Sequence, residues 1–268
     1  ADNLKGSLNN SQSPRRLNSK INLLQMKELN HALQTRPKKK TPGLDQLPYE
    51  AFTKAHNIIS NCLLQLFNCC WKNGLMPKNW GNYNITLLAK PGKDKQLIDS
   101  YRPISLTLCM LKIYETLINN RLKTHLQKKA KLPAWFGCTN GTGADEIIGY
   151  TMQLIQEWKQ KKLLPHALSL DLSKAYNRVK REVLWKQLKK TNINQHLFNA
   201  IRATYEWQST TIKIGAKNSR SFTLKNGIRQ GSVLSTTLYM VYMLSMAEDL
   251  NNLLNNNPNK IQAFFYID

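Results

Sequence analysis

The stretch Pro165-His-Ala-Leu-Ser-Leu-Asp-Leu-Ser-Lys-Ala-Tyr-Asn-Arg-Val179 decides how the rest of the sequence is interpreted. Its apolar part, residues 167–172, predicts a short buried strand with Asp171 inside it. An ionised carboxylate in such a strand is costly unless it is paired, hydrogen-bonded or bound to a metal. Two interpretations follow: a core aspartate tied to a neighbouring lysine or arginine, or a metal ligand.

A second carboxylate stands in a similar setting at the other end of this region. The run Ala263-Phe-Phe-Tyr-Ile-Asp268 is apolar and aromatic, which is typical of a strand, and it ends in Asp268. In a chain with few acids, two aspartates on two core strands favour a divalent-metal site. The sequence therefore predicts that Asp171 and Asp268 lie side by side on neighbouring strands.

The chain is strongly basic. Its 268 residues include 39 lysines and arginines against 16 aspartates and glutamates, which gives a formal charge of +23 and a pI near 9.9. This balance indicates a polyanionic partner. Nucleic acid is favoured over a membrane surface, because no long apolar span, signal sequence or basic amphipathic anchor stands out. Five cysteines without CxxC spacing predict reduced thiols in an intracellular protein.

Periodicity predicts a mixture of helices and strands. Residues 1–18 are polar and rich in asparagine and serine, which is typical of a disordered lead-in. Helices are expected over residues 20–34, 48–73, 108–126, 144–162 and 232–254. Strands are expected over residues 84–90 and 100–105, and a hairpin over 209–223. The helix over 144–162 should face inward through Ile148, Met152 and Ile155.

Two basic segments are candidates for contacts with phosphate. The hairpin over residues 84–105 would present, on one projecting element, Lys90, Lys93, Lys95 and Arg102. That combination suits a triphosphate or a nucleic-acid backbone, although an ordinary surface hairpin can have the same composition. The run Arg36-Pro-Lys-Lys-Lys40 would break the first helix. Its interpretation stays open between a solvated loop, a nuclear-localisation signal and a patch that contacts phosphate.

A series of motifs in register resembles the reverse transcriptase of a non-LTR (LINE-type) retrotransposon. The motifs that resemble the fingers are Thr41-Pro-Gly-Leu-Asp45, Gly74-Leu-Met-Pro-Lys-Asn-Trp80, Leu88-Ala-Lys-Pro-Gly-Lys-Asp94, Ser100-Tyr-Arg-Pro-Ile-Ser-Leu106 and Lys112-Ile-Tyr-Glu-Thr-Leu-Ile-Asn-Asn-Arg121. Those that resemble the palm are Leu170-Asp-Leu-Ser-Lys-Ala-Tyr-Asn-Arg-Val179, Asn226-Gly-Ile-Arg-Gln-Gly-Ser-Val-Leu-Ser235 and Phe265-Tyr-Ile-Asp268. The resemblance covers residues 20–268.

The resemblance implies an α+β fold, the fingers and palm of a right-hand polymerase, with an antiparallel palm sheet packed on helices. Residues 1–19 would be the disordered lead-in and residues 20–164 the fingers, including the basic hairpin over 84–105. Residues 165–268 would be a palm that stops within the last catalytic motif. The thumb would be absent, and the chain alone would be weak or inactive.

The family's activity is RNA-directed DNA synthesis, which adds dNTPs to a DNA primer on an RNA template. The resemblance implies two Mg²⁺ ions, or Mn²⁺ in their place, held by carboxylates on adjacent strands. Asp171 and Asp268 match the catalytic, metal-binding carboxylates, and Leu172 matches a metal ligand that acts through its backbone carbonyl.

Five further residues match the family's nucleotide contacts. Lys90 and Arg102 match the fingers residues that grip the triphosphate. Tyr176 matches the aromatic gate that excludes a ribose 2′-hydroxyl, although a packing aromatic is the alternative. Gln230 and Gly231 match the turn that lies against the incoming nucleotide and the template base, where glycine permits close approach of the backbone.

Some residues depart from the family pattern. Phe136-Gly-Cys-Thr-Asn-Gly-Thr-Gly143 stands where the family shows an arginine-containing segment, and Asn177 replaces a frequent aspartate. A non-catalytic nucleic-acid-binding relic, an intron-encoded reverse transcriptase, an RNA-templated RNA polymerase and an assembly platform stay as alternatives. The expected partners are an RNA template, a DNA primer, dNTPs and the other domains of a larger retrotransposon polyprotein, with no membrane. The expected location is the nucleus or the cytoplasm.

Overall fold

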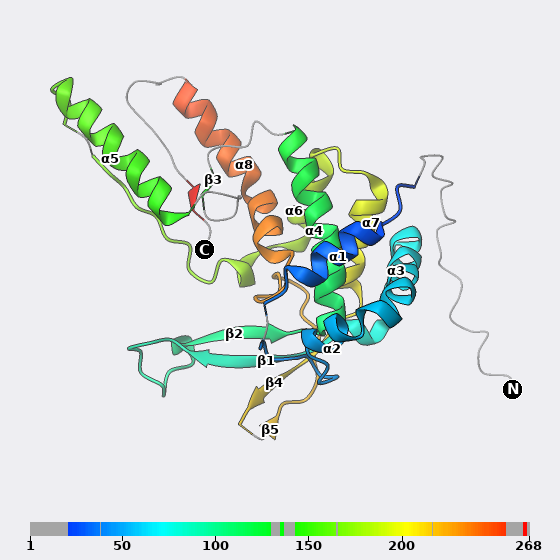
Figure 1. Cartoon of the computed structure of the whole chain (residues 1–268). Coiled ribbons are helices and arrows are strands. Elements are labelled where there is room, and N and C mark those ends of the chain that lie inside the picture. Colours follow the sequence, from blue (N-terminus) through cyan, green and yellow to red (C-terminus); the bar gives the residue numbers. More distant parts are fainter. Residues whose placement is uncertain are drawn as a thin grey trace, which may run out of the picture.

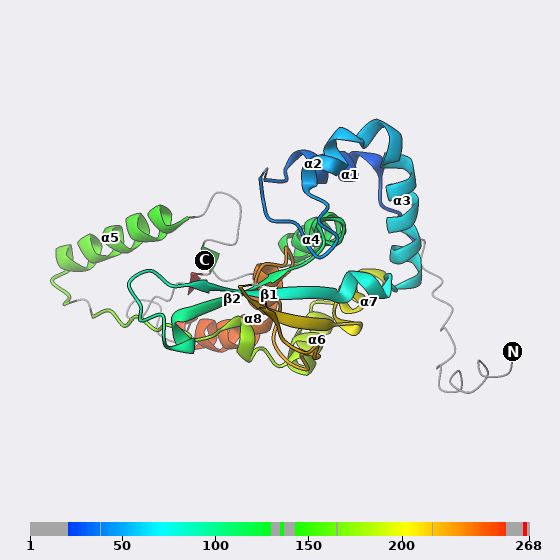
Figure 2. The ribbon, with the colours of Figure 1, turned by 90° about the horizontal axis from the view of Figure 1, so that it is seen from below.

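A computed structural model describes residues 21–37, 39–129, 135–136, 143–164, 166–215, 217–255 and 265–266. Most helices gather beside a small sheet, and the first two strands of this sheet project from it as a long hairpin (Figures 1 and 2). Helix α5 (Ala144–Gln160) lies apart from the other helices in both views. Over these ranges, no helix is long and apolar enough to cross a lipid bilayer.

Helix α4 (Cys109–Lys129) lies at the centre of the hydrophobic core. Its fully buried apolar side chains are those of Leu111, Ile113, Tyr114, Leu117, Ile118 and Leu122. Burial on several sides is typical of a helix packed between other elements, and α4 contacts α1 (Met26–Gln34), α7 (Gln195–Glu206) and α8 (Ser235–Asn255). The sequence predicted one apolar face for this helix. Burial instead extends to most residues from Cys109 to Asn119, and it places the carboxylate of Glu115 inside the core.

The predicted helix over residues 48–73 is divided at Ala55 into α2 (Tyr49–Lys54) and α3 (His56–Asn73). Helix α3 ends at Gly74, whose φ of +61° lies in the left-handed region that glycine adopts without strain. The rings of Phe67 on α3 and Tyr114 on α4 lie 5.3 Å apart. This aromatic contact joins the two helices in one core.

Arg121 on α4 fastens the beginning of the described chain to the core. Its guanidinium donates hydrogen bonds to both carboxylate oxygens of Glu28, each at 2.8 Å, and to the carbonyls of Asn22 and Leu23 at 2.6 and 2.7 Å. The guanidinium also lies 4.8 Å from the ring centroid of Trp71. Bidentate pairing of this kind is among the stronger side-chain contacts in proteins.

The main sheet has the strand order β2-β1-β4-β5. Strand β1 (Asn82–Ala89) pairs antiparallel with β2 (Tyr101–Leu106) and parallel with β4 (Ser209–Ile214), and β4 turns back into β5 (Lys217–Asn218). Both predicted hairpins are therefore confirmed. Their union in one sheet was not predicted, because local patterns do not specify which edges of two distant hairpins pair.

The pairing of β1 with β4 joins the two predicted subdomains, the fingers and the palm. Strand β1 belongs to the predicted fingers and β4 to the predicted palm, and one hydrophobic core contains residues from Leu24 to Ala247. Helix α6 (Arg181–Lys190) packs on α8, which buries Leu238 and Val241 as predicted. The boundary between fingers and palm near residue 165 stays a prediction.

One wrong prediction concerns the strand over residues 167–172. Residues 167–172 form no strand, and the side chains of Leu168 and Leu170 are 85% and 81% exposed. A strand needs neighbouring backbone partners, and the short strand β6 (Phe265–Tyr266) pairs in parallel with β3 (Trp135–Phe136) instead. The antiparallel palm sheet expected at this segment is therefore not formed in the described part of the chain.

The second error concerns the predicted inward face of α5. Ile148 is 58% exposed and Met152 is 56% exposed, and no residue of α5 is buried. The apolar spacing correctly predicted a helix, but a helix buries its apolar face only if another element packs against it.

Candidate functional site

A cavity of about 550 Å³ brings together three of the predicted site residues, Tyr176, Gln230 and Gly231. The rest of its lining comes from the segment before α2, from α2, β2 and α4, and from the residues after the turn: Arg36, Pro37, Lys40, Thr41, Tyr49, Leu106, Lys112, Ser232, Val233, Ser235 and Thr236. A cavity of this size can hold a nucleotide-sized ligand. Its described lining includes cationic side chains and no acidic one, so the cavity favours an anionic ligand.

The turn at Gln230 and Gly231 is docked on strand β2. The Ser105 N–H donates a hydrogen bond to the Gln230 carbonyl at 2.7 Å. Gly231 has a φ of +109°, and a Cβ at this position would lie 2.9 Å from the Ser105 carbonyl oxygen. Glycine is required here because both the backbone conformation and the space exclude a side chain. The turn is therefore fixed against the hairpin that carries the predicted triphosphate-binding residues.

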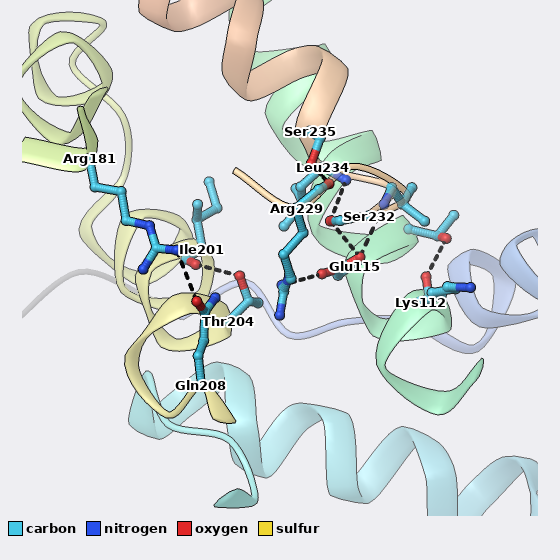
Figure 3. Close-up of polar contacts among 12 residues, drawn as sticks. Lys112, Glu115, Arg181, Ile201, Thr204, Gln208, Arg229, Ser232, Leu234 and Ser235 are labelled. Atoms are coloured by element: carbon cyan, nitrogen blue, oxygen red, sulfur yellow. Dashed lines mark hydrogen bonds and ion pairs between the residues drawn. The ribbon is translucent and has the colours of Figure 1, made fainter. Parts of the chain in front are cut away.

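A buried ion pair holds the segment that follows this turn (Figure 3). Glu115 Oε1 accepts a hydrogen bond from Arg229 Nη2 at 2.7 Å, and the two side chains are 0% and 1% exposed. Glu115 Oε2 accepts from Ser232 Oγ at 2.9 Å and from the Val233 N–H at 3.1 Å. Ser235 Oγ donates to the Arg229 carbonyl at 2.5 Å. A buried charge needs this degree of hydrogen bonding, and here the bonding ties residues 229–235 to α4.

A second arginine fixes the approach to the turn. Arg181 Nε donates a hydrogen bond to the Gly227 carbonyl at 2.8 Å. Arg181 Nη2 donates to Gln208 Oε1 at 2.9 Å, a contact drawn in Figure 3. Burial lowers the pKa of Arg181 from its ordinary value. Its guanidinium also lies 5.0 Å from the ring centroid of Tyr205.

Backbone hydrogen bonds then connect the turn to the Tyr176 segment. The Ile228 N–H donates to the Tyr176 carbonyl at 3.0 Å, and the Gly227 N–H donates to the Val179 carbonyl at 2.8 Å. The ring of Tyr176 packs edge-on against Tyr239 of α8, with centroids 5.3 Å apart. Tyr176 and the Gln230 turn therefore keep a fixed relative position.

Lys90 and Arg102 lie on the projecting hairpin and do not line the cavity. Leu88 pairs with Arg102 in the sheet, and the Lys90 N–H donates to the Ser100 carbonyl at 2.8 Å. Because side chains alternate between faces along a strand, this register places Lys90 and Arg102 on the same face. They are the two predicted triphosphate contacts, and the structure puts them near each other.

Contacts through Asp99 connect the hairpin to the segment that carries Asp171. Lys90 Nζ donates to the Asp99 carbonyl at 2.8 Å, and Lys174 Nζ pairs with Asp99 Oδ1 at 2.7 Å. The hydrogen bond from Lys174 lowers the pKa of the exposed Asp99 carboxyl. Lys174 follows Asp171 by three residues, so the hairpin and the Asp171 segment are neighbours.

Asp171 and Leu172 lie in an exposed irregular segment between α5 and α6. No described basic side chain forms an ion pair with Asp171, so the interpretation of a core aspartate tied to a lysine or arginine is wrong. An exposed carboxylate beside a backbone carbonyl offers the hard oxygen ligands that Mg²⁺ takes, so both residues fit such an ion. Asp268 lies outside the described residues, and its meeting with Asp171 stays a prediction. Within the described ranges, no three His, Cys, Asp or Glu side chains cluster as ready-made metal ligands.

Sequence reasoning missed the residues that hold the turn in place. Glu115 is the single acid among the apolar residues of α4, and a lone carboxylate in a helix predicted to be core was a signal of a buried ion pair. The basic residues of the cavity come from two separate segments, Arg36 and Lys40 from the run before α2 and Lys112 from α4. Only the fold shows that they share a cavity.

Comparisons with known proteins agree with the motifs. The model of the family described as reverse transcriptase (RNA-dependent DNA polymerase) matches residues 88–268. A probable RNA-directed DNA polymerase from transposon BS of Drosophila melanogaster is 28% identical over 238 residues, which are 88% of this chain and 26% of that protein. An RNA-directed DNA polymerase from mobile element jockey of Drosophila funebris is 30% identical over 229 residues, 84% of this chain and 24% of that protein.

Solved structures are also similar. The structure of apo telomerase from Candida tropicalis, truncated from the C-terminal domain, has 13% sequence identity and a TM-score of 0.48. The match covers 82% of this chain and 48% of that chain. The chain spans about a quarter of the length of the curated relatives that it matches.

Proposed function

Because this chain belongs to the reverse transcriptase (RNA-dependent DNA polymerase) family, we propose that the protein copies an RNA template into DNA. The predicted resemblance to non-LTR retrotransposon enzymes is confirmed by relatives named as polymerases of transposons and mobile elements. The observation that carries the proposal is the cavity in which Tyr176 and the Gln230–Gly231 turn meet. The proposed substrates are a DNA primer, an RNA template and dNTPs.

The proposed reaction transfers a nucleotide to the primer. The primer 3′-hydroxyl attacks the α-phosphate of the dNTP, and pyrophosphate leaves. Lys90 supplies a compact charge and Arg102 a forked donor, and together they would bind the triphosphate. The same two charges would stabilise the negative charge that develops on the leaving pyrophosphate. Their shared face on the hairpin supports this role.

Tyr176 and the turn would bind the sugar and base of the incoming nucleotide. The ring contact with Tyr239 and the hydrogen bond that the Ile228 N–H donates to the Tyr176 carbonyl hold Tyr176 in place. A ring held in this position would collide with a ribose 2′-hydroxyl, which favours dNTPs over rNTPs. Gln230 offers an amide at the same cavity, and Gly231 keeps the backbone close to strand β2.

Asp171, the Leu172 carbonyl and Asp268 would hold two Mg²⁺ ions, for which Mn²⁺ can substitute. Such ions, when bound, lower the pKa of the primer 3′-hydroxyl and neutralise charge on the phosphates. The exposure of Asp171 and the absence of an ion pair to any described lysine or arginine leave its carboxylate oxygens available. We place these residues in a palm over residues 165–268 and the hairpin in fingers over residues 20–164.

Primer extension tests the proposal. The protein at its full natural length is given an RNA template, an annealed DNA primer, Mg²⁺ and either dNTPs or rNTPs. We expect extension with dNTPs, and a rate about a thousandfold lower for Asp171→Asn, because loss of a metal ligand removes about 4 kcal/mol of transition-state stabilisation. Since Asp171 is exposed, the variant should melt and bind template-primer like the wild type.

Asp249→Asn, an exposed aspartate on α8, is the matched control and should keep full activity. Template binding without any incorporation by the wild type would identify a non-catalytic relic. Equal use of rNTPs would identify an RNA polymerase. Full activity of Asp171→Asn would remove Asp171 from the catalytic site.

A further inference from the structure

Asp99 and Lys174 form an exposed ion pair that has no role in the reaction as proposed above. Lys174 Nζ lies 2.7 Å from Asp99 Oδ1, and the two side chains are 57% and 75% exposed, respectively. The residues are 75 positions apart in the sequence. An exposed pair contributes little to the stability of a fold. Its consequence therefore lies in the two segments that it joins.

Asp99 is connected to both proposed triphosphate contacts. It lies in the short 3₁₀ helix η2 (Ile98–Ser100), three residues before Arg102. The Asp99 carbonyl accepts a hydrogen bond from Lys90 Nζ at 2.8 Å, and the adjacent Ser100 carbonyl accepts one from the Lys90 N–H at 2.8 Å. A lysine ammonium has three donors, so this contact orients Lys90 and leaves donors for a phosphate. A shift of Asp99 would carry both cations with it.

Lys174 is connected to the proposed metal ligand and to the aromatic gate. It follows Asp171 by three residues and has a φ of +54°, which is uncommon for a residue other than glycine. Its carbonyl accepts hydrogen bonds from the N–H groups of Asn177 and Arg178, at 3.0 and 3.2 Å. These bonds fix the start of the 3₁₀ helix η3 (Tyr176–Arg178). The backbone at Lys174 therefore helps to place Tyr176 as well as Asp171.

The ion pair is the polar contact that joins the two segments. Over the ranges that the structure describes, no other hydrogen bond or ion pair joins residues 166–174 to the β1–β2 hairpin. Residues 166–172 are exposed and form neither a helix nor a strand. A segment without burial or strand partners takes its position from the few contacts that it makes. The pair therefore controls how the segment and the hairpin lie relative to each other.

We propose that Asp99 and Lys174 are positioning residues, which hold the triphosphate contacts of the hairpin at a fixed distance from Asp171. The inference rests on the proposed function, which places the triphosphate at the hairpin and a metal ion at Asp171. Phosphoryl transfer is sensitive to this distance, since a misplacement of about 1 Å between reacting groups can slow a reaction about a hundredfold. The pair meets this need from outside the nucleotide cavity, whose lining contains neither residue.

The sign of the effect at Asp99 separates positioning from simple electrostatics. As a negative charge beside Lys90, Asp99 would repel a triphosphate, so its neutralisation would lower the KM for dNTPs. As a positioning residue it has the opposite effect, and its neutralisation raises the KM. Neutralisation of Lys174 raises the KM in both cases. Asp99→Asn is therefore the deciding variant.

Steady-state incorporation of dNTPs by the protein at its full natural length, on an RNA template with a DNA primer, tests the proposal. At about 50 mM KCl, Asp99→Asn and Lys174→Gln should each raise the KM for dNTPs about threefold, the size expected for loss of an exposed ion pair. The kcat and the affinity for template-primer should stay unchanged. The double variant should equal either single variant, because all three lack the same contact. At about 300 mM KCl the difference from the wild type should shrink, because salt screens exposed charges.

The ion pair between Arg202 and Glu206 on α7 provides the matched control. Its atoms lie 3.5 Å apart and its side chains are also exposed. Neither residue lines the cavity. Glu206→Gln and Arg202→Gln remove the same charges as the two test variants and should leave the KM for dNTPs unchanged.

Hydrogen–deuterium exchange of the protein without nucleotide tests the contact independently of catalysis. The Lys90 amide on the hairpin and the amides of Asn177 and Arg178, which donate to the Lys174 carbonyl, report on the two segments. Each should exchange about threefold faster in Asp99→Asn and in Lys174→Gln, because both segments open more often without the pair. The two control variants should exchange like the wild type.

Three results would overturn the assignment: an unchanged or lowered KM in Asp99→Asn, effects of the two single variants that multiply in the double variant, or unchanged exchange of the reporting amides. A KM raised by Lys174→Gln but lowered by Asp99→Asn would make Lys174 a direct phosphate contact. Failure of the proposed function is seen separately. It would appear as absence of dNTP incorporation by a wild-type protein whose amides still respond to the two variants.

Discussion

Two acidic side chains, Glu115 and Asp171, have opposite surroundings. The carboxylate of Glu115 is fully buried and accepts three hydrogen bonds, from Arg229, Ser232 and the Val233 backbone. Asp171 is exposed in an irregular segment and has no ion pair with a described residue. The comparison separates two tasks. The buried acid fixes the turn that would contact the nucleotide, whereas the exposed acid keeps its oxygens available for chemistry.

Removing the buried carboxylate should cause the largest loss of stability. Glu115→Ala leaves the guanidinium of Arg229 buried without its charge partner, and breaking a buried pair in this way costs about 3–5 kcal/mol. Urea denaturation measures this loss. Asp171→Ala, the matched change at the exposed acid, should shift the free energy of unfolding by no more than about 0.5 kcal/mol.

A double variant sharpens the comparison. Glu115→Leu with Arg229→Met replaces the pair by apolar side chains of similar length and should be more stable than Glu115→Ala alone. A double-mutant cycle compares Glu115→Leu, Arg229→Met and the double variant with the wild type. The coupling energy between the two side chains should reach about 1 kcal/mol or more, because they are in direct contact. Additive effects would show that the pair does not act as one unit.

The turn held by Glu115 offers the next test. Gly231→Ala introduces a Cβ at 2.9 Å from the Ser105 carbonyl oxygen and at a φ of +109°. We expect a loss of about 2–3 kcal/mol in stability, from backbone strain and from displacement of the turn off strand β2. Thermal denaturation measures the loss, and primer extension should slow because Gln230 moves with the turn.

Gly92→Ala is the matched control for this change. Gly92 also has a positive φ, +68°, but no atom lies within 4 Å of an added Cβ. Only the conformational strain applies there, about 1 kcal/mol. Equal losses for the two variants would show that the close approach of the added Cβ to the Ser105 carbonyl oxygen costs nothing beyond the conformational strain.

The motifs predicted the residues of the cavity better than the pairing of strands. Tyr176, Gln230 and Gly231 were predicted from motifs far apart in the chain, and the structure brings them into one cavity. Helices and hairpins were predicted because their hydrogen bonds and apolar spacing are local. The strand at 167–172 was predicted from apolar residues alone, but a strand also needs a partner edge, and no sequence pattern supplies one.

The sequence also could not predict which distant charged residues come together inside the fold. Glu115 and Arg229 are 114 positions apart, so their pairing depends on how α4 packs against residues 229–235. The same holds for Arg36 and Lys112, whose approach depends on Gly43 resting on the backbone at Leu108. Charge and composition predicted a polyanionic partner. Only the packing shows which of the many cations share a cavity.

Glu28 is intermediate between the two acids, and its effect should be the smallest. Its side chain is 25% exposed and pairs with Arg121 at 2.8 Å. Burial by itself would raise the pKa of Glu28, but the hydrogen bonds and charge of Arg121 and the hydrogen bond from the Gln25 N–H outweigh burial, so the pKa lies below its ordinary value of 4.5. A carboxyl with a lowered pKa stabilises the fold fully at a pH above its pKa in the unfolded chain, and this contribution is lost as the pH falls through its pKa in the folded protein.

Glu28→Gln should therefore lower the stability by about 1 kcal/mol at pH 7 and by less at pH 3. Melting temperatures of both proteins across this range measure the difference, with the exposed Glu182→Gln on α6 as control. A difference that stays constant from pH 7 to pH 3 would mean that the charge of Glu28 does not contribute, and that Arg121 holds the chain through the carbonyls of Asn22 and Leu23.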